Sequence, residues 1–303
     1  MLAVDSATLC YVCDGSRVRA YTDRFGYQHL GCGDCRFVRL DPKHLVPGAT
    51  VYTAAYFNGS LHRRTQGKLG YPPSYADQSS SYRSRSYDRY ASEVVRLVRQ
   101  RTSSRPSVLD IGCAYGGFLK LLSSRLPEAE VHGVELDPEV CRIASANLGG
   151  ARVYCTDLKD DATVPRGAFD AITLIDAIEH LEDPRSYLDV LRDCCRLDGY
   201  LLLSTPNIES FNARIYGDRW ILHTPPYHTC YFGTKSLSLI LAQTGWKLAS
   251  FFTERTIFHN ERSGMETWRG KAARALFDSR ACDLLTNEIL KIGSIITMIA
   301  RKA

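Results

Sequence analysis

The chain has 303 residues, of which 45% are hydrophobic and 23% are charged, with a formal net charge of +5. This balance is that of a globular protein and excludes an intrinsically disordered chain. The charge is too mild for a dedicated nucleic-acid-binding protein, whose domains carry a pronounced basic excess. The length allows one full α/β domain together with a small accessory module.

The first residues and the cysteine content indicate the compartment. The opening sequence MLAVDSATLC contains Asp5 and lacks the basic start and the apolar stretch of a signal peptide. No apolar run elsewhere approaches the roughly 18–20 residues that cross a bilayer. We therefore expect a cytoplasmic protein with no membrane partner. Its eleven cysteines then serve as metal ligands and buried thiols, not as disulfides.

Residues 1–45 contain two CxxC pairs, Cys10 with Cys13 and Cys32 with Cys35, separated by eighteen residues. Two such pairs at this spacing are typical of four thiolates arranged tetrahedrally around Zn²⁺. Four thiolates leave no open coordination position, so the predicted zinc ribbon has a structural role and no catalytic one. A redox-active pair or a set of buried free thiols are the alternatives.

Beyond this module, residues 46–82 are rich in Tyr, Ser, Gly and Pro, which predicts a connector and lid. Strands then alternate with helices through residues 83–303, and this order predicts right-handed βαβ crossovers and a parallel sheet. We predict helices over 87–100, 118–125, 138–146, 185–195 and near 283–291. We predict strands over 107–111, 131–135, 153–155, 171–175, 200–204, 247–253 and 294–301.

The segment from Val108 to Gly117, which reads VLDIGCAYGG, follows a predicted strand and opens a predicted helix. Glycines in this position let the backbone approach a bound nucleotide closely. An acidic residue, Glu135, ends the next strand, where a carboxylate can accept hydrogen bonds from both ribose hydroxyls. The two features together indicate a cofactor that contains ribose, whereas ordinary turn chemistry explains a single pair of glycines equally well.

Residues 83–303 resemble the class I methyltransferases in several motifs. These are Asp110–Gly116 with an aspartate before the glycines, Cys155–Leu158, Phe169–Leu181 and Leu197–Asn207. The resemblance implies a Rossmann-like α/β fold with a mostly parallel sheet, an antiparallel last strand and S-adenosyl-L-methionine as cofactor. Ala114 stands where the family commonly has glycine; alanine is the smallest replacement and fits there if φ is negative, so we expect cofactor binding to persist. The implied cofactor-binding residues are Asp110, Gly112, Cys113, Gly116, Glu135, Leu136, Asp157, Leu158 and Asp176.

The order of cysteine pairs, Tyr-rich connector and methyltransferase-like region resembles the sugar C-methyltransferases of antibiotic deoxysugar pathways over about residues 10–260. Those enzymes have a further C-terminal domain without a counterpart in this sequence. They also carry the pattern Tyr-His-Glu-His-x-x-Tyr-Phe, which residues 225–232 match as Pro-Pro-Tyr-His-Thr-Cys-Tyr-Phe. Tyr227 replaces the glutamate, so the sequence favours methylation of oxygen over carbon.

The acceptor in this fold lies beyond the carboxyl ends of the strands. Methyl transfer requires removal of a proton from the acceptor, and histidine is the usual base near neutral pH. The resemblance implies His180 and His228 as catalytic residues, although His180 could instead pack or cap the adjacent helix. The segment from Pro206 to Phe232 is rich in aromatic residues, which suits a ring-shaped acceptor. The predicted substrate-binding residues are Glu179, Tyr216, Trp220, His223, Tyr227 and Tyr231.

The partner is therefore expected to be a small molecule, such as a nucleotide-linked or glycosidic sugar or a secondary metabolite. Arg83 and Arg85 either contact a substrate phosphate or belong to a solvated helix face. One alternative function is an RNA methyltransferase that grips RNA through the zinc module, but residues 1–45 lack a Lys/Arg stripe. Another alternative is a catalytically inactive cofactor-binding scaffold. Both a monomer and a homodimer are compatible with the sequence.

Overall fold

The computed structural model describes residues 9–46, 81–101, 105–149, 152–254 and 290–303. The chain divides into two compact units. The first unit comprises Met1–Leu45, Ser204–Ile240 and Ser250–Met298, and the second comprises Val46–Leu203, Leu241–Ala249 and Ile299–Ala303. The predicted connector over 46–82 and most of the helix predicted near 283–291 lie outside the described residues. The predicted domain boundaries remain a prediction.

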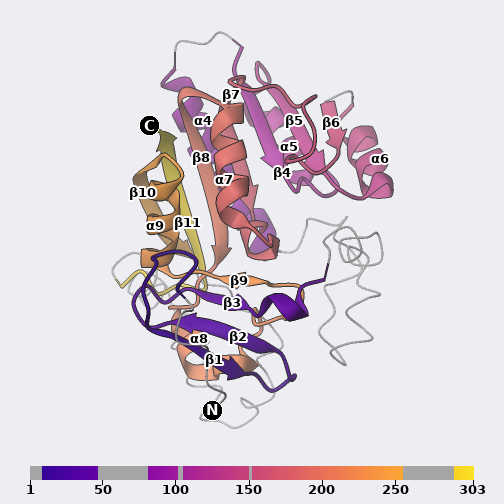
Figure 1. Cartoon of the computed structure of the whole chain (residues 1–303). Coiled ribbons are helices and arrows are strands. Elements are labelled where there is room, and N and C mark those ends of the chain that lie inside the picture. Colours follow the sequence, from indigo (N-terminus) through magenta and orange to yellow (C-terminus); the bar gives the residue numbers. More distant parts are fainter. Residues whose placement is uncertain (1–8, 47–80, 102–104, 150–151, 255–289) are drawn as a thin grey trace, which may run out of the picture. The chain divides into compact units, whose positions relative to one another are not determined.

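A seven-stranded sheet has the strand order β10-β11-β8-β7-β4-β5-β6 (Figure 1). Its centre is parallel: β4 pairs with β5 and β7, and β5 pairs with β6. The end of β11 lies beside the start of β8, since Lys302 donates to the Cys195 carbonyl and Arg301 pairs with Asp198; these two strands are antiparallel. The strands are β4 Ser107–Ile111, β5 Glu130–Glu135, β6 Arg152–Cys155, β7 Phe169–Ile175, β8 Cys195–Pro206, β10 Trp246–Glu254 and β11 Ile295–Lys302.

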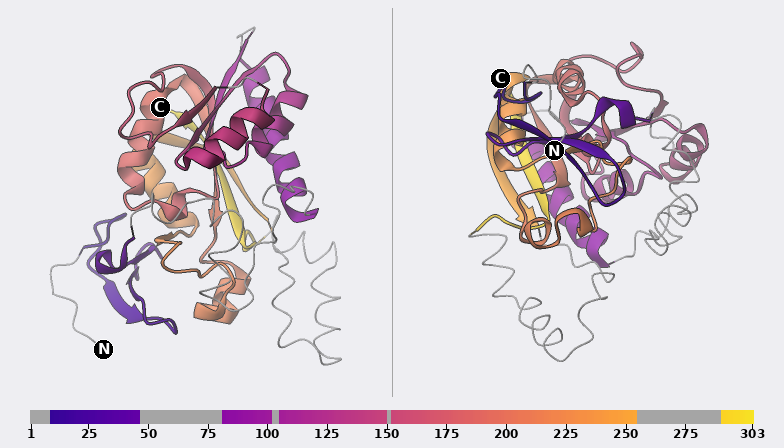
Figure 2. Two further views of the ribbon diagram at one scale, coloured as in Figure 1. Left: turned by 90° about the vertical axis from the view of Figure 1, so that its right-hand side faces the viewer. Right: turned by 60° about the horizontal axis from the view of Figure 1, so that its bottom comes forward.

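Helices of the second unit cover both faces of these strands. In Figure 1, α7 lies in front of the sheet and α4 behind it, and Figure 2 gives the same layers from two other directions. Asp137 caps α6 and Asp183 caps α7, each followed by a proline that suits the first helical turn. The bounds are α4 Ser81–Arg99, α5 Gly117–Arg125, α6 Pro138–Asn147, the 3₁₀ turn η2 Ile178–His180, α7 Pro184–Cys194 and α9 Thr234–Gln243, which ends beyond the first unit.

The first unit contains a second, four-stranded sheet in the order β1-β2-β3-β9. Its strands are antiparallel, and β9 comes from a segment almost two hundred positions after β3. The short elements of this unit were not predicted, because two- to five-residue strands leave little periodicity to read. They are β1 Val18–Thr22, β2 Gln28–Cys32, β3 Val38–Leu40, η1 Pro42–His44, α8 Phe211–Tyr216, η3 Gly217–Arg219 and β9 Cys230–Tyr231.

The predicted Rossmann-like α/β architecture is confirmed, with most elements ending within a few residues of the predicted bounds. Two differences stand out: α9 was not predicted, and β8 begins at Cys195 and not at Tyr200. The polar pair Asp198-Gly199 indicates a turn in the sequence, and Asp198 indeed has a φ of +61°. Strand pairing nevertheless continues through this pair, since the neighbouring strand supplies hydrogen bonds that local propensity does not reveal.

A single buried carboxylate connects four segments of the second unit. Asp170, near the start of β7, is 1% exposed and accepts hydrogen bonds from the Ser107 backbone N–H at 2.9 Å and from Arg101 Nε at 3.1 Å. Its other partner is Arg196 of β8, whose Nη1 lies 2.6 Å from Oδ2. Because a buried carboxylate is stable only when its charge and lone pairs are satisfied, this network positions the ends of β4, β7 and β8 together.

Asp170→Ala should therefore lower the free energy of unfolding by about 3–5 kcal/mol, because it leaves two guanidinium groups and a buried N–H without their acceptor. Urea denaturation measures this loss. Asp189→Ala is the matched control: its ion pair with Arg192 is 3.0 Å long but lies at the surface. That variant should lose no more than about 1 kcal/mol. Similar losses in both variants would contradict a special role for Asp170.

Candidate functional site

The loop after β4 has the backbone shape that its glycines predict. Gly112 and Gly116 have φ values of +69° and +80°, a region that glycine adopts without steric cost. The N–H groups of Gly112 and Cys113 both donate to the Val134 carbonyl, at 2.9 and 3.1 Å. These bonds attach the loop to β5. The negative φ that would let alanine fit without strain is not what the structure has: the φ of Ala114 is +48°, and the loop turns back toward β5 at this position.

Glu135, at the end of β5, is the acceptor toward which this turn is directed. Its Oε2 accepts the Ala114 N–H at 3.0 Å and its Oε1 accepts the Leu136 N–H at 2.7 Å. The side chain is 5% exposed, and burial raises the pKa of its carboxyl above the ordinary value. Glu135 therefore fixes the loop and at the same time presents acceptor oxygens at the carboxyl end of the sheet.

Asp110 lies one residue before the end of β4, where the parallel register sets it opposite Gly133 and Thr173. Thr173 Oγ1 donates to Asp110 Oδ1 at 2.6 Å. Burial, with the charge of Glu135 as a further contribution, raises the pKa of Asp110 to about 7. Among the residues that the structure describes, no Lys, Arg or His forms an ion pair with Asp110 or Glu135. The two carboxylates thus suit a ligand that brings positive charge and hydrogen-bond donors.

The other predicted cofactor residues lie in the same unit. Asp157 follows β6, where its Oδ1 accepts the Lys159 N–H at 3.1 Å, and Leu158 beside it is fully buried. Asp176 follows β7 with a φ of +48°. Because β4, β5, β6 and β7 are mutually parallel, their carboxyl ends meet at one edge, which is the position of ligands in such sheets.

One contributor, Gly133 in the middle of β5, was missed by sequence reasoning. A side chain built on Gly133 would place its first carbon 2.6 Å from Cys113 Sγ. Because Gly133 has no side chain, the buried side chain of Cys113, which belongs to the loop, can pack against β5. A glycine in the interior of a predicted strand is the available signal for such a close approach.

In the first unit, the sulfur atoms of Cys10, Cys13, Cys32 and Cys35 all lie within 4.8 Å of one another. Cys10 Sγ is 3.6 Å from Cys35 Sγ, and Cys13 Sγ is 3.6 Å from Cys32 Sγ. Four sulfurs at the usual Zn–S length of about 2.3 Å are roughly 3.8 Å apart in a tetrahedron. The observed spacing therefore fits a tetrahedral metal ion of the kind the sequence predicts.

Backbone donors also point toward these sulfurs. The Val12 N–H lies 3.4 Å from Cys10 Sγ, and the Asp34 N–H lies 3.3 Å from Cys32 Sγ. Such contacts stabilise a thiolate over a thiol, because an N–H dipole is attracted to negative sulfur. Gly15 adjoins the cluster as well, since a side chain on it would meet Asp34 at 2.4 Å.

A second buried polar cluster, again missed by sequence reasoning, joins distant parts of the first unit. Asp23 Oδ2 lies 2.9 Å from His29 Nε2 and 3.0 Å from His223 Nε2. Burial lowers the pKa of both imidazoles, so neutral rings that each donate one N–H to the carboxylate account for this geometry. His223, a predicted substrate residue, is thus 6% exposed and bound to Asp23.

The predicted acceptor residues are divided between the units. Trp220, Tyr227, His228 and Tyr231 are buried in the first unit, where Tyr216 ends α8. His228 Nδ1 lies 2.8 Å from the Leu222 carbonyl oxygen, which can only accept, so the ring nitrogen carries the proton. In the second unit, Glu179 is buried and His180 is half-buried in η2, while Arg85 is exposed on α4. The side chain of Arg83 lies outside the described residues.

The chain is similar to curated O-methyltransferases. It is 29% identical over 139 residues to a ubiquinone biosynthesis O-methyltransferase of Chromobacterium violaceum, which covers 44% of this chain. It spans only 59% of that relative's own length. The identity to the ubiquinone biosynthesis O-methyltransferase of Xanthomonas oryzae pv. oryzae is 30% over 176 residues, which covers 54% of this chain and 69% of the relative.

None of the helices in the described part of the chain has both the length and the apolar character that a membrane span requires.

Among solved structures, a geranyl diphosphate C-methyltransferase from Streptomyces coelicolor A3(2) is similar, with a TM-score of 0.49 and 14% identity over 73% of this chain and 80% of that chain. A family model described as a methyltransferase domain matches residues 82–250, more than half of the chain. These residues contain the loop after β4, both buried carboxylates and the parallel centre of the sheet. The chain therefore belongs to the methyltransferase-domain family and has its Rossmann-like class I fold.

Proposed function

We propose that the protein transfers a methyl group from S-adenosyl-L-methionine to a small-molecule acceptor. The observation that carries this proposal is the pair of buried carboxylates, Asp110 and Glu135, at the ends of two adjacent parallel strands beside a glycine-containing loop. Among the described residues neither has a cationic partner. A ligand with an ammonium group, a sulfonium group and a ribose supplies the missing charge and donors.

Each predicted cofactor residue has a role that its position supports. Glu135 accepts hydrogen bonds from the ribose hydroxyls, and Asp110 lies on the side of the methionine ammonium group. Asp157, by its resemblance to the family motif, accepts the adenine amino group. S-Adenosyl-L-methionine supplies an electrophilic methyl group on positively charged sulfur. The chain's own contribution is to hold this group in line with the acceptor atom and to remove the acceptor's proton.

Glu135→Gln should weaken the binding of S-adenosylhomocysteine at least tenfold, because hydrogen bonds to a charged group contribute about 1.5–3 kcal/mol each. Glutamine keeps an oxygen for the Ala114 N–H, so the loop should persist better than in Glu135→Ala. Calorimetric titration measures the affinity. Glu139→Gln, which removes an exposed ion pair with Arg142 on α6, is the control and should bind normally. Equal affinities in all three proteins would contradict the ribose assignment.

We further propose that Cys10, Cys13, Cys32 and Cys35 bind one structural Zn²⁺. The mutual spacing of the sulfurs and the N–H groups aimed at them support this ligand set. Four protein ligands leave no position for water or substrate, so the metal stabilises the fold and takes no part in the chemistry. The strands of the surrounding sheet are two to five residues long, and a metal crosslink between the two cysteine pairs would stabilise so small a sheet.

The purified protein should contain about one zinc per chain, and Cys13→Ser should lose most of it and lower the melting temperature of the first unit. Metal analysis by mass spectrometry and a thermal scan measure the two effects. Cys155→Ser is the control, because this cysteine is exposed and outside the cluster. Full zinc content in Cys13→Ser, or less than half an equivalent in the wild type after mild purification, would rule the site out.

The acceptor is proposed to be a sugar or secondary-metabolite scaffold, methylated on oxygen. The names of the curated relatives support O-methylation of a small molecule, and the resemblance to the sugar methyltransferases supports the sugar class. His228 suits the role of base, because the proton on Nδ1, which faces the Leu222 carbonyl, leaves Nε2 as the acceptor nitrogen of the neutral ring. His180 is the other candidate from the same resemblance.

His228→Asn or His180→Asn should lower kcat by about 10²–10⁴-fold if that histidine is the base, since general-base catalysis typically contributes this much. Asparagine keeps a polar side chain but cannot take up a proton at neutral pH. Release of S-adenosylhomocysteine, measured with a panel of nucleotide-linked and free sugars, identifies the acceptor and gives the rate. The affinity for S-adenosylhomocysteine should stay unchanged. If both variants keep more than about a third of the wild-type rate, the base is another residue or catalysis relies on alignment.

A further inference from the structure

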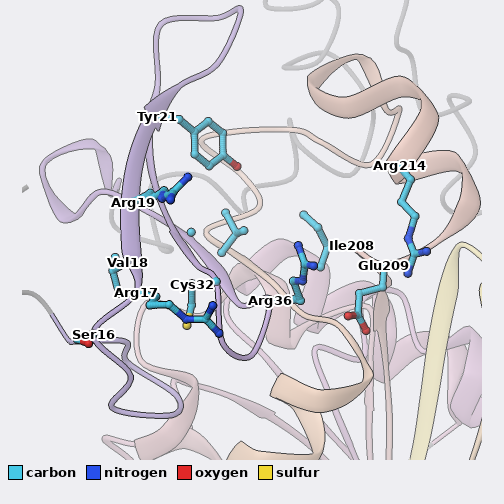
Figure 3. Close-up of a pocket in the computed structure, with 13 residues that line it drawn as sticks. Ser16, Arg17, Val18, Arg19, Tyr21, Cys32, Arg36, Ile208, Glu209 and Arg214 are labelled. Carbon is cyan, nitrogen blue, oxygen red and sulfur yellow. The ribbon is translucent and has the colours of Figure 1, made fainter. Parts of the chain in front are cut away.

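A cavity of about 1040 Å³ lies within the first unit, on one face of its four-stranded sheet (Figure 3). Arg19 and Tyr21 reach it from β1, Arg36 from the turn between β2 and β3, and Arg214 from α8. Figure 3 shows the β1 side chains on one side of the cavity and Arg214 with Glu209 on the other. The volume is at the upper end of the range for small-molecule sites, about 300–1,000 Å³.

A glycine lines this cavity at the centre of the sheet. Arg19, Gly31 and Val38 lie opposite one another in the antiparallel register, so they form one row across β1, β2 and β3. Gly31 contributes no side chain to that row. Its φ is not in the left-handed region, and an added first side-chain carbon would be in ordinary contact, 3.5 Å from Tyr21 and 3.6 Å from Val38. The backbone therefore does not require glycine, and alanine fits at this position, whereas a larger side chain would enter the cavity.

The cavity carries an excess of positive charge that the protein itself does not neutralise. Arg17 is paired with Asp34, 2.6 Å away, and Glu209 accepts the Thr234 N–H at 2.9 Å. Among the described residues, none forms an ion pair with the guanidinium groups of Arg19, Arg36 or Arg214. Arginines gathered around a cavity repel one another, so an arrangement of this kind favours a bound ligand with more than one negative charge.

We propose that this cavity binds the phosphate groups of a small phosphorylated ligand, such as a phosphate or diphosphate ester. Guanidinium groups match phosphate oxygens in pairs, and three uncommitted arginines match a diphosphate better than a single carboxylate. Tyr21, which is 41% exposed at the cavity, offers a ring face for the organic part of the ligand. The site lies entirely in the first unit and does not depend on the proposed methyl transfer.

The test measures binding of two probes, inorganic pyrophosphate and uridine diphosphate, to the full-length zinc-loaded protein by calorimetry. Both should bind saturably. Arg19→Gln and Arg214→Gln should each weaken binding about tenfold, the equivalent of one lost charged hydrogen bond. Arg39→Gln is the matched control: Arg39 belongs to β3 but its side chain lies over the Tyr11 ring, outside the cavity. It should bind both probes like the wild type.

A steric pair of variants tests the cavity itself. Gly31→Ala adds a group that the neighbours accommodate and should bind normally, whereas Gly31→Leu fills the space and should abolish binding of uridine diphosphate. If Gly31→Leu does not fold, as judged by zinc content and circular dichroism, the arginine variants decide. Three results would overturn the proposal: no saturable binding of either probe, the same loss in Arg39→Gln as in Arg19→Gln, or much tighter binding of single-stranded RNA whose affinity rises with its length.

Discussion

The structure depends on the burial of two like charges, Asp110 and Glu135, at the carboxyl ends of adjacent strands. Each is almost fully buried, and each raises the energetic cost of ionising the other. Among the described residues the compensation comes from hydrogen bonds: Thr173 donates to Asp110, while backbone N–H groups of the loop after β4 and of Leu136 donate to Glu135. Stability is thereby lost at the position where we propose that the cofactor binds, as is common at functional sites.

This constraint explains the shape of the loop. Its N–H groups must face β5 to satisfy Glu135 and the Val134 carbonyl, and the chain can turn that way only through left-handed conformations. Glycine supplies two of them at positions 112 and 116. Ala114 adopts the third at a cost of about 1–2 kcal/mol, which the surrounding hydrogen bonds offset. Gly133 completes the arrangement by leaving room for Cys113 behind the loop.

The first unit follows a different principle, because buried polar groups and a cysteine cluster join its distant segments alongside apolar residues such as Phe37 and Phe232. Four cysteines from two adjacent turns converge at one end, and Asp23 joins two histidines that are almost two hundred positions apart in the sequence. The sheet is completed by β9, which follows the fifth strand of the Rossmann-like sheet. A segment with the predicted acceptor residues is therefore also a structural part of the cysteine-containing unit.

The sequence by itself determined the alternation of strands and helices, the loop after β4, the acidic ends of β4 and β5 and the grouping of the cysteines. Each of these is a local pattern, carried by hydrophobic periodicity, glycine or short spacing, and local patterns survive without tertiary context. Only the tertiary structure decided the φ of Ala114, the start of β8, the pairing of β9 with β3 and the buried group of Asp23, His29 and His223. Each of these depends on partners far away in the chain. The sequence around a residue does not show which distant group will satisfy that residue's hydrogen bonds.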